Sequence, residues 1–99
     1  MMTLTKKDPF IRYEINRKIK AVLIRHAADL TELQYSNSGE VAYLFGKLVK
    51  DPNGDFSPAE VESMVREIAA IPEVQDVSYE LSNWAVMHEP GFIDIRQKL

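Results

Sequence analysis

The chain has 99 residues, which is enough for one domain with a single hydrophobic core. It contains no cysteine, and this excludes disulfide bonds, thiolate zinc sites and cysteine nucleophiles. The net charge of −3 is unevenly distributed, because residues 1–26 hold seven basic and two acidic side chains and the remainder hold five basic and thirteen acidic ones. The basic segment therefore has either a polyanionic partner or acidic neighbours within its own fold.

Residues 9–28 are predicted to form a helix. Asp8 is a suitable N-cap, and Pro9 suits the first helical position, where its missing N–H is not needed. The side chains expected to face the core recur every three or four residues: Ile11, Ile15, Ile19, Val22, Leu23 and His26. The basic side chains that lie mostly off this stripe are Arg12, Arg17, Lys18 and Lys20.

A β-hairpin should follow this helix. Residues 30–36 alternate apolar and polar side chains, and residues 41–49 are rich in β-branched and aromatic ones, as is typical of strands. Residues 37–40 form the turn between them, because Gly39 tolerates a positive φ and Asn and Ser favour turns.

The stretch DPNGDFSPAEVE, residues 51–62, has two interpretations. Its oxygen-bearing side chains at the ligand positions of an EF-hand calcium loop are Asp51, Asn53, Asp55, Ser57 and Glu62. However, a strand precedes it where an EF-hand has a helix, and Phe56 occupies the position where that loop requires glycine. Ser57, Pro58 and Glu60 instead match a capping box that begins a second helix, so a strand-to-helix connection is favoured.

Pro72 should end the second helix, whose apolar stripe consists of Val61, Met64, Val65, Ile68 and Ala69. Alternation then predicts a third strand over residues 74–87. The remainder, residues 88–99, begins with a Pro-Gly breaker, and its segment 92–95 is either a short edge strand or a packed tail.

The order helix, strand, strand, helix, strand predicts an α+β fold. We expect a two-layer αββαβ sandwich in which two helices cover one face of a three-stranded mixed sheet. Residues 1–99 form one domain, with a core at about 8–87 and a C-terminal extension at 88–99.

The chain resembles the BON domain, a small bacterial αββαβ module. The likeness covers roughly residues 8–86 and rests on a turn glycine, a strand that ends in a second glycine, and a valine-rich entry to the last strand. The matching residues are Gly39, Leu44, Gly46, Leu48, Val74 and Val77. This resemblance implies a binding or attachment module without catalysis.

The predicted second strand is apolar on both faces, although a sheet covered by helices on one side needs only one apolar face. The second apolar face of this strand, which the helices do not cover, has three interpretations. It is ordinary surface, or it is covered by residues 92–95, or it is open to a partner, a second copy or a lipid. We interpret it as a self-association surface, and the residues expected to form it are Val41, Tyr43, Phe45 and Trp84.

The alternative function is peripheral binding of anionic phospholipid or another polyanion by the first helix. The basic side chains that would supply the charge are Arg12, Arg17, Lys18 and Lys20.

The sequence contains no motif typical of an enzyme, a metal protein or a nucleic-acid-binding protein. His26 and His88 have no carboxylate or histidine at ligand spacing, and no nucleophile elbow, phosphate loop, zinc motif or RNA-binding GXXG loop occurs. We therefore expect neither an enzyme nor a nucleic-acid-binding protein, with no metal and no cofactor. The start resembles no signal peptide, and no apolar run approaches the roughly 18 residues of a membrane span, so we expect a cytoplasmic location.

Overall fold

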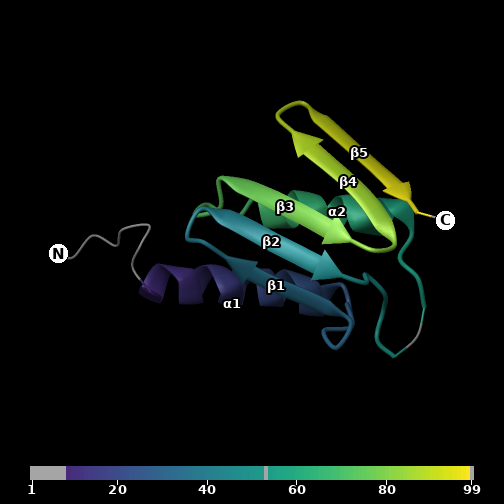
Figure 1. Cartoon of the computed structure of the whole chain (residues 1–99), viewed down its shortest axis with the longest axis horizontal. Coiled ribbons are helices and arrows are strands. Elements are labelled where there is room, and N and C mark those ends of the chain that lie inside the picture. Colours follow the sequence, from purple (N-terminus) through teal and green to yellow (C-terminus); the bar gives the residue numbers. More distant parts are fainter. Residues whose placement is uncertain (1–8, 53, 99) are drawn as a thin grey trace.

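The computed structural model describes residues 9–52 and 54–98. Its elements are α1 (Pro9–Arg25), β1 (Leu33–Asn37), β2 (Val41–Gly46), α2 (Pro58–Ala69), β3 (Asp76–Leu81), β4 (Trp84–Glu89) and β5 (Phe92–Gln97). Figure 1 shows one sheet made of β1, β2 and β3, with the hairpin of β4 and β5 set at an angle beside β3.

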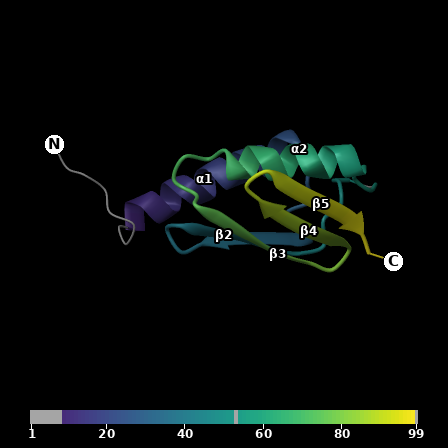
Figure 2. The same ribbon diagram turned by 90° about the horizontal axis from the view of Figure 1, so that it is seen from above.

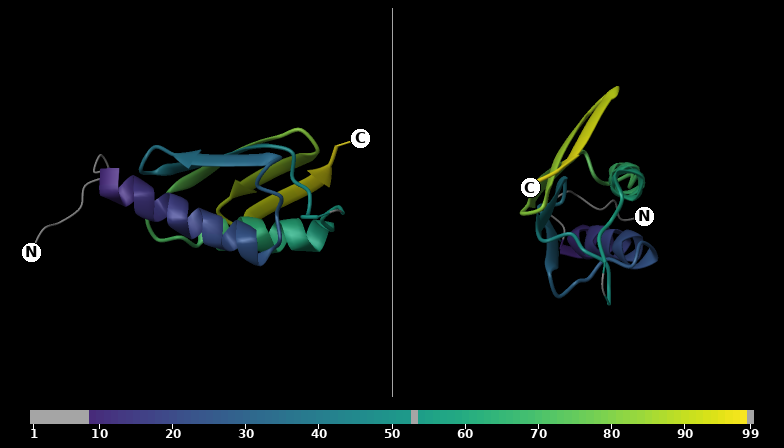
Figure 3. Two further views of the ribbon diagram at one scale, coloured as in Figure 1. Left: turned by 90° about the horizontal axis from the view of Figure 1, so that it is seen from below. Right: turned by 90° about the vertical axis from the view of Figure 1, so that its right-hand side faces the viewer.

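The three-stranded sheet is mixed and both helices lie on one of its faces. β2 is the central strand, antiparallel to β1 and parallel to β3. α2 provides the crossover that a parallel pair of strands requires. The views from above and from the end show the helices together on one side of the sheet (Figures 2 and 3). The predicted α+β fold, with both helices in one layer on one face of the three-stranded sheet, is confirmed.

The predicted third strand, residues 74–87, is wrong because the chain turns at Ser82 and Asn83. The Asn83 side chain holds this turn in place: Leu48 N donates to Asn83 Oδ1 (2.9 Å), and Asn83 Nδ2 donates to Leu48 O (2.8 Å). The sequence carried a signal of the break. Leu81 and Trp84 are both large and apolar but three residues apart, and a continuous strand places such residues on opposite faces.

Residues 88–98 are not an extension, so the predicted boundary at 87 is also wrong. It falls inside β4, and β5 pairs antiparallel with β4 along its whole length. Pro90 and Gly91 form the connecting turn, with Gly91 at φ 77°, as the third position of a type II turn requires. Of the two alternatives for residues 92–95, the edge strand is therefore observed.

The core fills the space between the helices and the sheets. The predicted stripes of both helices supply eight of the 18 buried apolar residues in the described part of the chain: Ile15, Ile19, Val22 and Leu23 from α1, and Val61, Met64, Val65 and Ile68 from α2. Ile11 and Ala69, also expected on these stripes, are only half-buried. The strands contribute buried side chains that include Leu33, Ala42, Leu44, Leu81 and Trp84.

α1 ends at Arg25, three residues before its predicted end, because a Schellman motif closes it. Ala27 adopts φ 60°, Ala27 N donates to Ile24 O (3.0 Å), and Ala28 N donates to Leu23 O (3.0 Å). The predicted cap at the other end, Asp8, lies outside the described residues.

α2 begins as predicted. Glu60 N donates to Ser57 Oγ (3.2 Å) and Ser57 N donates to Glu60 Oε1 (3.1 Å), so both bonds of the capping box are present. Lys50 also pairs with Glu60, at 2.6 Å between Nζ and Oε2. Glu62, the last EF-hand position, lies within α2 and pairs with Arg66, whereas Asn53 lies outside the described residues.

Gly46 ends β2 at a place where no side chain fits. Its φ is 110°, and a Cβ there would lie 2.4 Å from the backbone oxygen of Glu32. The close approach arises because β1 and β2 pair at this point, with Gly46 opposite Leu33.

Ala27 and Gly46 both have positive φ, so exchanging Gly and Ala at the two positions should have opposite effects. We expect Gly46→Ala to lower the free energy of unfolding by roughly 2 kcal/mol or more, through the strained φ and the clash with Glu32. Ala27→Gly should raise it by about 0.5–1 kcal/mol, because glycine relieves the left-handed conformation at some cost in unfolded-state entropy. Urea unfolding measures both. Effects of equal sign would contradict this account.

Candidate interaction surface

The open face of the β1–β2–β3 sheet points away from both helices. The pairing register places its side chains: Val41, Tyr43 and Phe45 on β2, Gln34 and Ser36 on β1, and Asp76, Ser78 and Glu80 on β3. Ala42 and Leu44, which alternate with them on β2, are buried against the helices. Val41, Tyr43 and Phe45, which the sequence expected to share one face of this strand, therefore lie on the face that the helices leave uncovered.

The middle of the open face is aromatic. Tyr43 is 38% exposed and Phe45 is 37% exposed, and Val41 beside them is half-buried. A shallow hollow of about 280 Å³ lies over them, lined by Ser36, Tyr43, Leu44, Phe45, Ser78 and Glu80. An apolar centre within a polar border is the usual composition of an interface patch.

The two borders of the open face differ in charge. β3 contributes the carboxylates of Asp76 and Glu80, whereas β1 contributes the neutral side chains of Gln34 and Ser36. The face is therefore acidic along one side only.

Trp84 does not belong to the open face, and this part of the predicted site is wrong. Its side chain is 1% exposed and lies in the core, at the first position of β4. The break at Ser82 and Asn83 moves it to the side that faces the helices, whereas a continuous strand would have left it near the sheet surface. Its indole Nε1 has no hydrogen-bond acceptor among the described residues.

The basic side chains of α1 do not form one surface. Lys18 is bound to Glu73 of the α2–β3 connection, with Nζ 2.6 Å from Oε2, and Arg17 pairs with Glu14 at 2.8 Å. Arg12 and Lys20 form no ion pair with a described residue. Acidic neighbours in the same fold therefore take up part of the basic charge.

α1 carries an exposed apolar stripe that the sequence analysis missed. Phe10, Tyr13 and Ile24 are each more than half exposed, and the rings of Phe10 and Tyr13 lie 6.5 Å apart. At 100° per residue these three share a side of the helix with Arg17 and Lys20, opposite the buried isoleucines. The spacing was visible in the sequence, but the predicted core stripe on the other side of the helix concealed it.

A polar cluster joins the end of α1 to α2. Arg25 Nη2 lies 2.5 Å from Glu67 Oε1, and His26 Nε2 contacts the other oxygen of the same carboxylate. Ser63 Oγ donates to Glu67 at 3.4 Å. The arginine, followed by the histidine, lowers the pKa of Glu67 below its usual value. His26 has thus a carboxylate partner that lies 41 residues away in the sequence.

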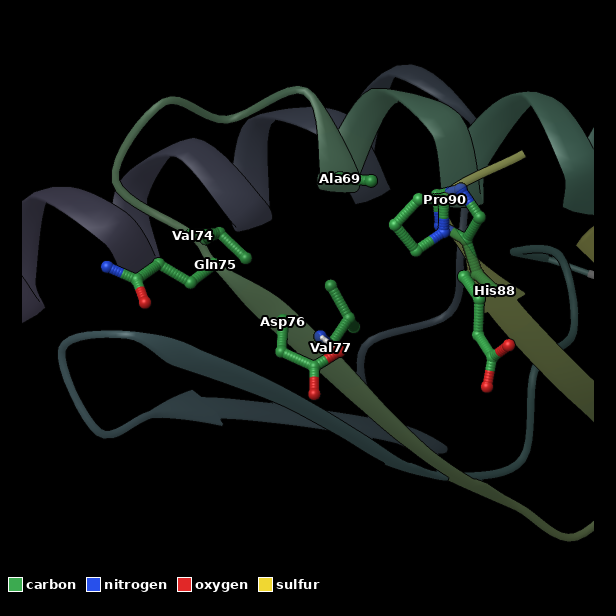
Figure 4. A pocket seen from close by; sticks show the side chains of 8 residues that line it. Ala69, Val74, Gln75, Asp76, Val77, His88 and Pro90 are labelled. Carbon is green, nitrogen blue, oxygen red and sulfur yellow. Dashed lines mark hydrogen bonds between the residues drawn. The ribbon is translucent and has the colours of Figure 1, made fainter. Parts of the chain in front are cut away.

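A second hollow, of about 230 Å³, lies between the end of α2, the start of β3 and the β4–β5 turn (Figure 4). It is lined by Ala69, Val74, Gln75, Asp76, Val77, His88, Glu89 and Pro90. The lining contains no hydroxyl or thiol nucleophile, and the Asp76 carboxylate accepts a hydrogen bond from Val77 N of its own strand (2.9 Å). This arrangement gives no nucleophile–base pair.

Within residues 9–52 and 54–98, no three side chains of the metal-ligating types come together. Neither α1 nor α2, the helices of this part of the chain, combines the length and apolarity that crossing a bilayer requires.

Comparison of the chain with protein-family models, with curated proteins and with solved structures gave no match. The assignment of function therefore depends on the surfaces described above.

The ion pairs between elements should make the fold acid-sensitive. Lys18 lowers the pKa of Glu73, and Lys50 together with the Ser57 N–H lowers the pKa of Glu60 to about 2. A carboxyl group whose pKa is lower in the folded than in the unfolded chain stabilises the fold above about pH 4.5, and that contribution is lost as the pH falls through its folded pKa.

We expect Glu73→Gln to reduce the free energy of unfolding by roughly 0.5–1 kcal/mol at pH 7, and by less at pH 3. Urea unfolding at the two pH values measures the difference. Glu80→Gln on the open face, which breaks no ion pair of the described residues, is the matched control. If Glu73→Gln lost the same free energy of unfolding at both pH values, the charge of Glu73 would not be what stabilises the fold.

Proposed function

We propose that this chain is a non-catalytic interaction module that self-associates through the open face of the β1–β2–β3 sheet. The observation that carries the proposal is the exposure of Tyr43 and Phe45 on the central strand, between two polar strands. Aromatic side chains in the middle of a patch are the usual anchors of protein interfaces. We propose no catalytic activity for the chain, and we propose a cytoplasmic location for it.

A second copy of the chain fits the charge pattern of this face. Two sheets that stack about a two-fold axis parallel to β2 place β1 of one copy over β3 of the other. Glu80 then faces the neutral Gln34 of the second copy and Ser78 faces Ser36, while Asp76 lies level with Val41, and the aromatic side chains of β2 meet at the centre. No like charges are forced together in this arrangement.

The size of the face sets the expected affinity. Three strands about 4.8 Å apart and about 20 Å long present a flat area of roughly 300 Å². Stable interfaces bury about 800 Å² on each partner, so this face alone gives weak, concentration-dependent association.

The resemblance to the BON domain supports a binding role, and we propose that the chain is a BON-like module. α1 to β3 follow the αββαβ order of that family, and β4 and β5 are added after it. Gly46, one of the matching glycines, is required where β2 ends.

Tyr43→Glu should weaken self-association at least about tenfold, because it places a carboxylate at the centre of the apolar patch. Sedimentation velocity over a wide concentration range measures the change, and circular dichroism verifies the fold. Ile24→Glu is the matched control, since Ile24 is also exposed but lies on α1. Unchanged association of Tyr43→Glu would refute the open face as the interface.

A second candidate function is peripheral binding to an anionic lipid surface through α1. The observation that favours it is the exposed stripe of Phe10, Tyr13 and Ile24 beside Arg17 and Lys20. Apolar side chains next to basic ones suit the boundary between headgroups and acyl chains. Arg12 adds charge at the same helix, whereas Arg17 is paired with Glu14 and Lys18 is held by Glu73.

If this candidate holds, Lys20→Glu and Ile24→Glu should each reduce binding to vesicles that contain phosphatidylserine, and binding should fall steeply with salt. Co-sedimentation with vesicles at low and high salt measures both effects. Tyr43→Glu now serves as the control. Binding that is independent of salt would exclude a charge-driven contact.

A further inference from the structure

β5 is the outermost strand, and no other strand pairs with its outer edge in the described part of the chain. Figure 1 shows β5 beyond β4, and the view from above in Figure 2 shows it without any element over it. Sheet edges of this kind pair readily with another strand.

The backbone groups on the free edge can be assigned. Lys98 N donates to Asn83 O (3.0 Å), which continues the β4–β5 pairing by one residue. Hydrogen-bonded pairs alternate along an antiparallel ladder, so the N–H and C=O groups of Ile93, Ile95 and Gln97 point away from β4. None of the other backbone hydrogen bonds of the described residues involves these three.

The edge lacks several of the usual protective features, although β5 carries the charged residues Asp94 and Arg96. Residues 92–97 contain no proline, no lysine and no bulge, and β5 pairs with β4 without interruption. We propose that a second copy of this chain binds here, with β5 against β5 in antiparallel orientation about a two-fold axis at Ile95. The two hairpins then form one continuous four-stranded sheet.

Charge complementarity selects this register. Asp94 and Arg96 lie on the outer face of the hairpin, and in the single chain they pair with each other, at 3.0 Å between Nε and Oδ2. With the axis at Ile95, Asp94 of each copy stands opposite Arg96 of the other. An axis at Asp94 or at Arg96 would instead place like charges opposite one another.

The same register covers an exposed aromatic ring. Phe92 is 51% exposed on the outer face, and Lys98 of the second copy would stand opposite it. The aliphatic part of a lysine side chain can cover apolar surface, and the ammonium group of Lys98 donates to Leu81 O of its own chain (2.8 Å). Ile95 meets its own counterpart on the inner face, next to the core.

This interface is separate from the open sheet face, so the two can be tested independently. The experiment uses Tyr43→Glu as the background, which removes the aromatic contact of the open face and leaves β5 intact. In that background, Asp94→Arg gives a chain with two basic residues on the outer face of β5, and Arg96→Asp gives one with two acidic residues.

Each of these variants alone should associate at least about tenfold more weakly than the background protein, because like charges stand opposite each other. An equimolar mixture of the two should associate again, since every Arg then faces an Asp of the other chain. Sedimentation velocity with one variant fluorescently labelled measures the mixed species. Glu32→Arg, a charge reversal at an exposed position outside the hairpin, is the matched control and should behave as the background protein.

The mixing result is decisive because the variants retain the same strands and differ only in charge. Restored association in the mixture supports the β5 pairing. A mixture that stays monomeric, or single variants that associate like the background, would overturn it. A loss of association caused by Tyr43→Glu alone concerns the open face, so failure of the proposed function and failure of this inference give different results.

Discussion

Two helices cover only one face of the β1–β2–β3 sheet, although its central strand, β2, carries apolar side chains on both of its faces. Ala42 and Leu44 are buried beneath the helices, so Tyr43 and Phe45 on the same strand point to the other side. Their partial exposure follows from this arrangement and not from any motif. The hairpin of β4 and β5 packs beside β3 and against α2, and thus leaves the open face uncovered.

The turn at Ser82 and Asn83 directs the rest of the chain. Asn83 bonds both backbone groups of Leu48, and this fixes the point at which the chain leaves the main sheet. Trp84 then enters the core instead of the surface, while Ile93 and Ile95 pack against the same core. The hairpin completes the hydrophobic interior, and its outer strand is left with a free edge. Because of this turn, Trp84 lies in the core and not on the open face of the main sheet, and β5 becomes an edge strand that is free to pair with another chain.

The charge asymmetry of the sequence is partly resolved inside the fold. Glu73 holds Lys18, and Glu67 holds Arg25 and His26, so the basic helix α1 is joined to acidic residues of α2 and of the connection that follows it. These contacts are half-exposed and stabilise the fold modestly. Arg17, which pairs with Glu14, and Lys20 lie beside exposed apolar side chains, so that side of α1 is amphipathic and not purely charged.

The sequence alone determined the features that depend on near neighbours. The two helices, the capping box at Ser57 and Glu60, the first hairpin and the α+β class all follow from periodicity and from residues three or four positions apart. Val41, Tyr43 and Phe45 were also correctly expected to share one face of β2.

The tertiary structure decided which face that was, because a shift of one residue in strand pairing exchanges the two faces. It also decided the burial of Trp84, the pairing of β5 with β4, and the ion pairs between α1 and residues more than forty positions away. These features depend on contacts between distant segments, and local patterns carry no information about which distant segments meet.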